Sequence, residues 1–290
     1  MSKIAIVTDS NSGITQDLAR DLGVSVIPMP FYINEKLYLE GITLSQEEFY
    51  ERLKNEESIS TSQPGPADVC GLWNTLLESY DQIVHIPMSS GLSASCDTAS
   101  GVAREYDGKV QVVDNQRISV TQKLSVFDAV NMAKTGMSAA QIKEKLTEEK
   151  LIASIYIMVD TLKYLKKGGR ITPAAAMLGT VLKLKPVLTI QGEKLDAYAK
   201  VRGQKQAKKT MIEAMKKDME ERFAEERKAG LMELAVAHTN NFAEAENFKA
   251  ELQSVFPDVP LRFVDPLSLS VSCHIGPGAL AVACAKRSKK

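Results

Sequence analysis

Four polar segments of the chain carry side chains that could bind an anion or take part in acyl transfer. They are residues 8–10, 61–64, 89–93 and 272–278, and each falls on a predicted loop. In a doubly wound α/β sheet, the loops at the carboxyl ends of the strands converge on one crevice. Hydroxyl groups and helix N-termini in such a crevice favour an anionic oxygen group. Each segment taken alone is also explained by a helix cap or a turn, so an anion site and separate structural roles both stay open at this point.

The basic segment Lys166-Lys167-Gly168-Gly169-Arg170 has two explanations of the same kind. Its glycines suit a helix C-cap, and its lysines suit the negative end of the helix dipole. Arg170, however, comes just before the apolar residues 174–182, so its guanidinium could reach an anion beside an apolar surface.

Ser93 and His274 also allow an enzymatic interpretation. With Asp9 they could form a serine-hydrolase triad, because a triad is defined by its geometry and not by sequence order. The serine loop is Gly91-Leu92-Ser93-Ala94-Ser95, which lacks the G-x-S-x-G elbow of the α/β-hydrolases. A serine esterase that uses Ser93 is therefore kept as the alternative function.

The composition argues against several other classes of protein. The 290 residues include 36 Lys plus Arg and 36 Asp plus Glu, so the chain lacks the positive charge of a nucleic-acid binder. Neither the G-x-x-x-x-G-K-[ST] nor the G-x-G-x-x-G nucleotide motif occurs. The 4 cysteines form no C-x-x-C pair and only 3 histidines are present, so we expect no metal site, no disulfide framework and no cofactor. The apolar run near the N-terminus is too short for a signal peptide, which predicts a cytoplasmic protein with no transmembrane segment.

Strands and helices alternate through the first half of the chain. Short apolar runs predict strands, and Asn34-Glu35 marks a hairpin turn. Ser45 begins a helix with a capping box, and Pro66 suits the first turn of another helix. Such alternation predicts a mostly parallel sheet with helices on both faces. We expect this α/β domain to span residues 1–150.

After residue 150 the pattern changes. We expect Asp160 to cap a short helix that ends at Gly168-Gly169, and Thr172 to cap an apolar helix over residues 174–182. Residues 204–229 predict one long charged helix, and Gln191-Gly192 marks a second hairpin. These features predict a second α/β domain over residues 151–290, with a mainly antiparallel sheet and helices.

Five motifs occur together in a specific order. They are Val7-Thr8-Asp9-Ser10, Thr61-Ser62-Gln63-Pro64, Ser89-Ser90-Gly91-Leu92-Ser93, the run from Leu162 to Ile171 that contains Lys166-Lys167-Gly168-Gly169-Arg170, and His274-Ile275-Gly276-Pro277-Gly278-Ala279-Leu280. In order and spacing the sequence resembles the DegV family, bacterial fatty-acid-binding proteins that include the FakB subunits of fatty acid kinase. The resemblance spans essentially the whole chain.

The resemblance implies a two-domain α/β protein that buries one long-chain fatty acid. By position, the hydroxyls of Thr61 and Ser93 would bind the carboxylate directly, with Ser62 beside them and Arg170 and His274 completing the polar network. The carboxylate-binding loops would belong to the first domain and the acyl-chain tunnel to the second. Guesses at the tunnel wall are Met177, Leu178 and Val181.

The resemblance further implies a partner. A separate ATP-dependent kinase subunit would phosphorylate the bound carboxylate for phospholipid metabolism, so this chain would not be an enzyme by itself. The lack of a nucleotide motif fits that division of labour. Arg202 and Lys205 are candidate docking residues, although solvated helix charges explain them more simply, and a transient membrane contact is compatible with a lipid carrier.

Two departures from the family pattern leave the acyl preference open. The chain has Ala94-Ser95 where the family usually has Gly-Thr, and Asp114-Asn115 where it often has Asp-Ser. Neither change touches the expected carboxylate ligands. A phosphosugar-binding domain is a third interpretation, and it predicts a small polar cavity in place of a long apolar one.

Overall fold

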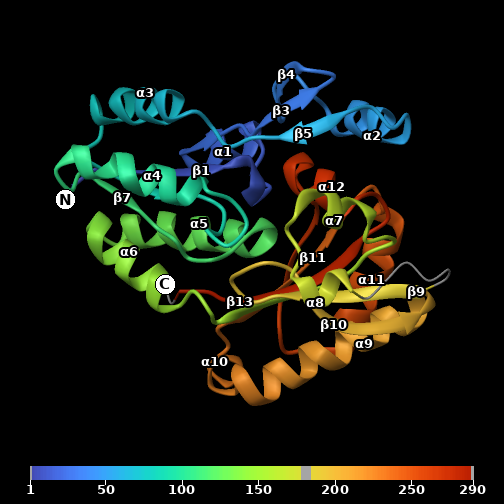
Figure 1. The fold of residues 1–290 in the computed structure, drawn as a ribbon. Helices are drawn as coiled ribbons and strands as arrows, with labels where there is room; N and C mark the ends of the chain where they lie inside the picture. Colours follow the sequence, from blue (N-terminus) through green and yellow to red (C-terminus); the bar gives the residue numbers. More distant parts are fainter. Residues whose placement is uncertain (1, 178–183, 289–290) are drawn as a thin grey trace. The chain divides into compact units, whose positions relative to one another are not determined.

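The computed structural model describes residues 2–177 and 184–288, and the chain divides into two compact units (Figure 1). The first comprises the chain up to Lys150 together with Ser268–Ser270. The second comprises Leu151–Leu267 and the chain from Val271 onward. The chain therefore passes between the units at three places, two of them at the ends of a three-residue segment.

The first unit is built on a four-stranded parallel sheet in the order β2-β1-β6-β7. Its strands are β1 (Ile4–Asp9), β2 (Val24–Ile27), β6 (Gln82–Ile86) and β7 (Val110–Val112). In the register of β1 with β6, Thr8 pairs with Ile86. The chain segments that follow these two central strands therefore begin side by side.

Helices cover both faces of this sheet, as the continuous apolar run of β1 requires. Ile6 packs in a core with α1, α5 and α6, whereas Ala5 and Val7 pack in a core with α3 and α4. Parallel sheets covered on both faces are typical of doubly wound α/β folds, and the predicted fold class of this half is confirmed. The helices are α1 (Gln16–Leu22), α3 (Pro66–Leu77), α4 (Ser95–Ala103), α5 (Ser119–Lys134) and α6 (Ala139–Glu148), with 3₁₀ turns at Ser10–Ser12 and Arg104–Tyr106.

A small antiparallel sheet in the order β4-β3-β5 belongs to the same unit. It consists of β3 (Pro30–Ile33), β4 (Lys36–Leu39) and β5 (Ile59–Thr61), and helix α2 (Gln46–Lys54) lies between β4 and β5 in the chain. The hairpin turn falls at Asn34-Glu35 as predicted, with both residues at positive φ. Strand β5 was not predicted, because its three residues pair with β3 about thirty residues away and carry no strong local pattern.

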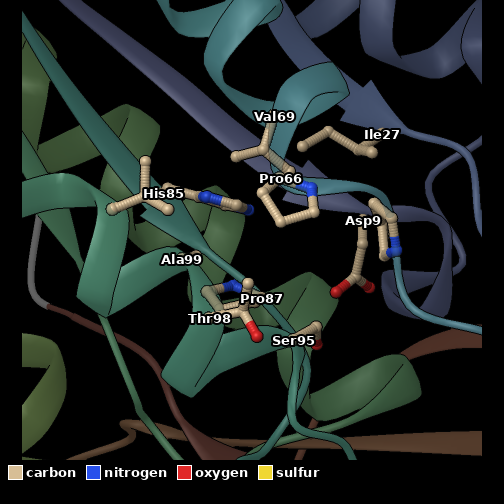
Figure 2. A pocket seen from close by; sticks show the side chains of 11 residues that line it. Asp9, Ile27, Pro66, Val69, His85, Pro87, Ser95, Thr98 and Ala99 are labelled. Carbon is tan, nitrogen blue, oxygen red and sulfur yellow. The ribbon is translucent and has the colours of Figure 1, made fainter.

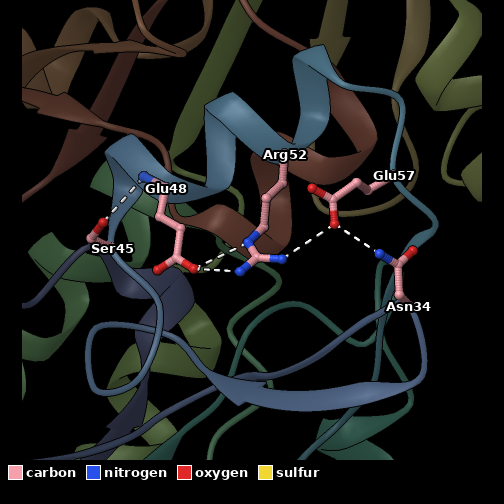
Figure 3. Close-up of polar contacts among 5 residues, drawn as sticks. All are labelled: Asn34, Ser45, Glu48, Arg52 and Glu57. Atoms are coloured by element: carbon pink, nitrogen blue, oxygen red, sulfur yellow. Dashed lines mark hydrogen bonds and ion pairs between the residues drawn. The ribbon is translucent and has the colours of Figure 1, made fainter.

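A polar network fixes the segment that leads into β5 (Figure 3). Arg52 of α2 binds Glu48 at 2.7 Å and Glu57 at 3.2 Å, and Asn34 Nδ2 donates to Glu57 at 2.8 Å. Ser45 caps α2 by accepting from the Glu48 N–H, as the capping box predicts. Helix, hairpin and β5 are thus held together just before Thr61.

The second unit contains a six-stranded sheet in the order β10-β9-β8-β13-β11-β12. All neighbours are antiparallel except the pair β11 and β12, so the predicted mainly antiparallel sheet is confirmed. Strand β10 is an edge strand, and its residues Tyr198, Lys200 and Arg202 are exposed. The strands are β8 (Ala153–Met158), β9 (Leu184–Ile190), β10 (Asp196–Arg202), β11 (Met232–His238), β12 (Leu261–Pro266) and β13 (Leu280–Lys286).

The two faces of this sheet carry side chains of different size. On one face Tyr156, Met158 and Leu280 pack with α9 and α11 in a core rich in methionine and phenylalanine. On the other face β13 places three alanines, which pair with β8 and β11. The buried residues on this alanine face include Ala153, Ile155, Ile157, Ala235, Ala237, Ala281, Ala283 and Ala285.

Helices of the second unit differ from their predictions in three places. They are α7 (Lys163–Gly168), α8 (Pro173–Ala176), α9 (Gly203–Lys217), α10 (Ala224–Lys228), α11 (Phe242–Val255) and α12 (Leu269–Ile275). The single long helix over residues 204–229 is wrong, because a π-helical turn at Asp218–Arg222 separates α9 from α10. Buried tertiary bonds hold that wider turn: the Tyr156 hydroxyl donates to Asp218 at 2.7 Å, and Arg222 donates to Ser154 Oγ at 2.7 Å.

The second difference concerns the cap of α7, and the third concerns α12. Thr161 Oγ1 accepts from the Lys163 N–H, whereas Asp160 binds Lys185, so the prediction that Asp160 caps the helix is wrong. Helix α12 was not predicted at all, and it places His274 in a last helical turn instead of in the loop predicted over residues 272–278. The cap of α8 is as predicted, with Thr172 Oγ1 accepting from the Ala175 N–H.

Candidate functional site

The turn after β1 is anchored by the buried carboxylate of Asp9, which is 2% exposed. Asp9 Oδ2 accepts from the Met88 N–H at 2.8 Å. Its Oδ1 accepts from the Asn11 N–H at 3.0 Å and from Gln122 Nε2 at 3.2 Å. Burial raises the pKa of Asp9, and these hydrogen bonds oppose that shift. Asp9 therefore ties the end of β1 to the chain that leaves β6, and hydrogen-bond donors other than a histidine occupy its carboxylate.

The serine loop between β6 and α4 is held at several points. The Ser89 N–H donates to the Arg117 carbonyl at 2.9 Å, and Ser90 Oγ donates to Asp114 at 2.6 Å. At the end of the loop, Ser93 Oγ accepts from the Ser95 N–H at 3.2 Å. This bond uses an oxygen lone pair, so the hydroxyl hydrogen of the half-buried Ser93 can still be donated to another acceptor. Ser93 thus combines a bond that holds the end of the loop with the donor function that a carboxylate needs.

Thr61 is the last residue of β5, and Ser62 follows it. Thr61 pairs with Phe31, and the Ser62 N–H donates to the Pro30 carbonyl at 3.1 Å. Thr61 is half-buried and Ser62 is exposed. Gln63 then donates to Thr98 Oγ1 of α4 at 3.2 Å. The loop that carries Thr61 and Ser62 is therefore attached both to the small sheet and to α4, which begins two residues after Ser93.

A narrow pocket lies beneath these loops in the first unit (Figure 2). Its wall includes Asp9, His85 and Ser95 with three prolines, and it has room for about one water molecule. His85 is 3% exposed, its Nδ1 has no hydrogen-bond partner in the structure, and burial lowers its pKa to about 3. His85 is therefore neutral, and the pocket is too small to hold an alkyl chain.

In the second unit, two of the motifs pack directly on each other. A Cβ added to Gly168 of α7 would overlap His274 Nδ1 and lie 3.0 Å from His274 Cε1. A Cβ added to Gly276, where φ is +81°, would overlap the ring of Tyr164. The glycines of both motifs thus allow close packing of α7 against the end of α12. Only Gly169 fits the predicted C-cap role, with φ +69° and an N–H that donates to the Leu165 carbonyl.

Arg170 and His274 are electrostatically coupled. Burial and, to a smaller extent, the nearby Arg170 guanidinium together lower the pKa of His274 to about 4. The Arg170 guanidinium also donates to the Gly168 carbonyl. At neutral pH this pair therefore presents a fixed cation beside a neutral imidazole, and both groups can donate hydrogen bonds to an anion.

The remaining predicted site residues are either exposed or outside the described residues. Met177 is 84% exposed, so its described position does not place it against an apolar interior. Leu178 and Val181 lie outside the described residues. Arg202 and Lys205 are exposed at the junction of β10 and α9, whereas the neighbouring Lys208 is paired with Glu244 and Glu251 at 2.7 and 2.5 Å.

The sequence analysis missed two polar residues that support the loops. Gln122 of α5 donates to Thr8 and Asp9, and Glu40 after β4 accepts from Ser10. The sequence offers no clear signal for Gln122, because its neighbours Thr121 and Lys123 are polar as well, and it offers none for Glu40. Within residues 2–177 and 184–288, no group of three His, Cys, Asp or Glu side chains is placed to hold a metal ion, and no helix there is long and apolar enough to span a membrane.

Comparison with known proteins identifies the family of this chain. The sequence pattern of the DegV family of uncharacterised proteins matches residues 3–287. The chain belongs to the DegV family. It is 32% identical to a DegV domain-containing protein of Listeria monocytogenes, with 97% of each chain covered. It is 30% identical to the protein DegV of Bacillus subtilis, over 96% of this chain and 98% of that one.

Solved structures of DegV proteins share the whole fold. A fatty-acid-binding DegV family protein from Thermus thermophilus has a TM-score of 0.87 at 28% identity, covering 98% of this chain and 99% of its own. The Bacillus subtilis DegV, a fatty acid binding protein, has a TM-score of 0.85 at 30% identity, covering 99% of this chain and 100% of its own. The predicted family and the two-domain α/β fold are both confirmed.

Proposed function

We propose that this DegV protein binds one long-chain fatty acid. The observation that carries the proposal is its likeness, over nearly the whole chain, to two structures of fatty-acid-binding DegV proteins at 28 and 30% identity. In the proposed complex Thr61 and Ser93 donate their hydroxyl hydrogens to the carboxylate and Ser62 lies beside them. Arg170 and His274 complete the polar network.

The chemistry of these residues suits a carboxylate. An unpaired carboxylate in an apolar site is costly, and hydrogen bonds to a charged acceptor are stronger than neutral ones. Ser93 keeps a donor hydrogen while its oxygen accepts from the Ser95 N–H. His274 stays neutral at physiological pH because its pKa is lowered to about 4. Arg170 therefore supplies the positive charge, and the hydroxyl groups orient the carboxylate through their hydrogen bonds.

The alkyl chain is assigned to the second unit, on the alanine face of the sheet. Burying a methylene contributes about 0.8 kcal/mol, so a chain of about fifteen contributes on the order of 10 kcal/mol before the costs of binding. On this face β13 presents the small side chains of Ala281, Ala283 and Ala285, which let an alkyl chain approach the strand closely in the proposed complex. Affinity then comes from the tail, and orientation comes from the carboxylate.

Mass spectrometry tests this function directly. The purified protein is denatured and extracted with organic solvent, and the extract is analysed for lipid. In parallel, native mass spectrometry measures the mass of the folded protein with its ligand. One fatty acid per chain supports the proposal. An empty protein that also fails to take up added fatty acid contradicts it, and turnover of an aryl ester that is abolished by Ser93→Ala would favour the esterase instead.

The proposed complex serves a second protein. An ATP-dependent kinase subunit would phosphorylate the bound carboxylate, and this chain would shield the tail and position the attacking oxygen. Arg202 and Lys205 are exposed and available for docking, whereas Lys208 already pairs with two glutamates. The location in the cytoplasm and the link to phospholipid metabolism are part of the same proposal.

Arg170→Ala is expected to lower acyl-phosphate formation at least about tenfold while changing the melting temperature little. The guanidinium would stabilise charge on the carboxylate, and losing one charge-assisted hydrogen bond costs about 1.5–3 kcal/mol. The assay mixes fatty-acid-loaded protein with a purified fatty acid kinase subunit and ATP, and traps acyl phosphate with hydroxylamine. Lys194→Ala, at an exposed lysine of the β9–β10 turn, is the control. A melting temperature that falls in proportion to activity would instead give Arg170 a structural role.

A further inference from the structure

His85 is a buried polar side chain on an otherwise apolar face of the parallel sheet. It belongs to β6, where Ile83, two residues earlier, packs in the core with α3 and α4. Val7 and Val112 pair with His85 in the sheet and belong to the same core. The His85 ring packs edge-on against Trp73 of α3, with ring centroids 5.5 Å apart and planes at 79°. These contacts hold the imidazole in place, and its aliphatic neighbours offer it no hydrogen bond.

Two buried polar atoms of this region lack partners. Within the part of the chain that the structure describes, neither His85 Nδ1 nor Ser95 Oγ makes a hydrogen bond. The imidazole is neutral, since burial lowers the pKa of His85 to about 3. A neutral imidazole has one N–H and one lone pair, and a hydroxyl can both donate and accept. Both atoms thus keep unused hydrogen-bonding capacity, which costs free energy in a buried place unless another group satisfies it.

Both side chains line the narrow pocket of the first unit, and Figure 2 shows them around it with Asp9. The three polar groups come from different elements: His85 from β6, Ser95 from the first residue of α4, and Asp9 from the end of β1. Three prolines also stand in the wall. Proline has no N–H and a restricted backbone, so these residues neither satisfy the two atoms nor let the wall close around them. A buried water needs about two to four polar partners, and the pocket has room for about one.

We propose that this pocket binds a single water molecule, which bridges His85 Nδ1 and Ser95 Oγ and so holds the first residue of α4. Water donates and accepts at the same time, so it can satisfy a ring nitrogen and a hydroxyl together. The Ser95 N–H donates to Ser93 Oγ at 3.2 Å. The bridge therefore steadies the residue that holds the Ser93 hydroxyl. It lies within the first unit and does not depend on a bound fatty acid.

A high-resolution crystal structure of the full chain tests the bridge without any variant. Density for one water about 2.7–3.2 Å from both His85 Nδ1 and Ser95 Oγ supports the proposal. A pocket that lacks such density overturns it, as does a direct bond from either atom to another protein group. In Ser95→Ala the density should weaken or vanish. Ser60→Ala, which removes an exposed hydroxyl outside the pocket, should leave it unchanged.

The bridge also predicts coupling between two substitutions. His85→Phe removes Nδ1 and keeps a ring against Trp73, and Ser95→Ala removes Oγ. Either change alone leaves the opposite group and the water short of a partner, whereas both together remove the need for the bridge. The double variant should therefore exceed the stability expected from additive effects by at least about fivefold in the unfolding equilibrium constant. Urea unfolding followed by fluorescence of Trp73, the one tryptophan of the chain, measures this constant.

The control pair is His85→Phe with Ser60→Ala, whose effects should add because Ser60 lies outside the pocket. Additive effects of His85→Phe and Ser95→Ala would overturn the bridge. A His85→Phe variant that does not fold leaves the crystallographic test to decide.

Amide hydrogen exchange reports whether the water holds the start of α4. In His85→Phe the Ser95 N–H should exchange at least about fivefold faster than in the wild type, because its residue has lost an attachment. Tyr106→Phe is the matched control, since Tyr106 also packs edge-on against Trp73 but does not line the pocket. It should leave the exchange of Ser95 unchanged. Equal exchange in the wild type and His85→Phe would overturn the inference, while a protein that takes up no fatty acid would overturn only the proposed function.

Discussion

Fatty-acid affinity is expected to fall at least about 100-fold when Ser93→Ala and Thr61→Val are combined. Each hydroxyl would donate to a charged acceptor, and the loss of such a bond costs about 1.5–3 kcal/mol. Valine keeps the shape of Thr61 and its place in β5, so the loss is of hydrogen bonding and not of packing. Isothermal titration with a long-chain fatty acid measures the effect.

The control for this variant is Ser60→Ala, which removes an exposed hydroxyl from the same strand one residue before Thr61. Its affinity should match that of the wild type. Thr61→Ser, which keeps a hydroxyl, should recover most of the affinity in the presence of Ser93. If the double variant binds as tightly as the wild type, the carboxylate lies elsewhere.

Gly168→Ala is expected to lower the melting temperature by several degrees and to weaken fatty-acid binding about tenfold. The added Cβ would overlap His274, so the imidazole must move or α7 must shift. Overpacking of this kind costs about 1–3 kcal/mol, and each kcal/mol lowers the melting temperature of a domain of this size by about 2–4 °C. Calorimetry and ligand titration on the same samples measure both effects.

Gly71→Ala is the matched control, because Gly71 also has an ordinary helical φ and a Cβ there meets nothing within 4 Å. It should be neutral or slightly stabilising. His274→Ala opens space beside Gly168, so in that background Gly168→Ala should cost little stability. If Gly168→Ala is equally costly with and without His274, the contact between the two motifs is not the reason for the glycine.

The local parts of the fold could be predicted from the sequence. The turn at Asn34-Glu35 and the caps at Ser45 and Thr172 are present because each depends on side chains within a few residues. The alternation of strands and helices likewise gave the parallel sheet of the first unit. These features need no knowledge of distant contacts.

The elements that the sequence did not predict depend on contacts between residues far apart in the chain. Strand β5 exists because it pairs with β3, and the π-helical turn is held by Tyr156 and Ser154 from β8. Helix α12 begins where Glu40, more than two hundred residues earlier, accepts its N–H groups. No local pattern can show such partners, because the chain brings them together only when it folds.

The candidate site likewise has some features that are visible in the sequence and others that depend on tertiary packing. Hydroxyls after strands and a glycine pair before Arg170 are visible in the sequence, and their order gave the family. The reason for Gly168 is not visible, because it lies in the packing against His274. The buried support by Asp9 is not visible either, because the Met88 N–H and Gln122 that bind its carboxylate lie far from it in the sequence.

The position of β10 at the sheet edge bears on how the docking residues should be altered. An unpaired strand edge is a template for self-association, and charged side chains there, lysine above all, protect proteins against aggregation. Lys200 and Arg202 are exposed on β10 beside Tyr198. Neutral replacement of the docking residue Arg202 would remove part of that protection together with any kinase contact. Charge reversal to glutamate removes the positive charge that docking would use and keeps the edge soluble.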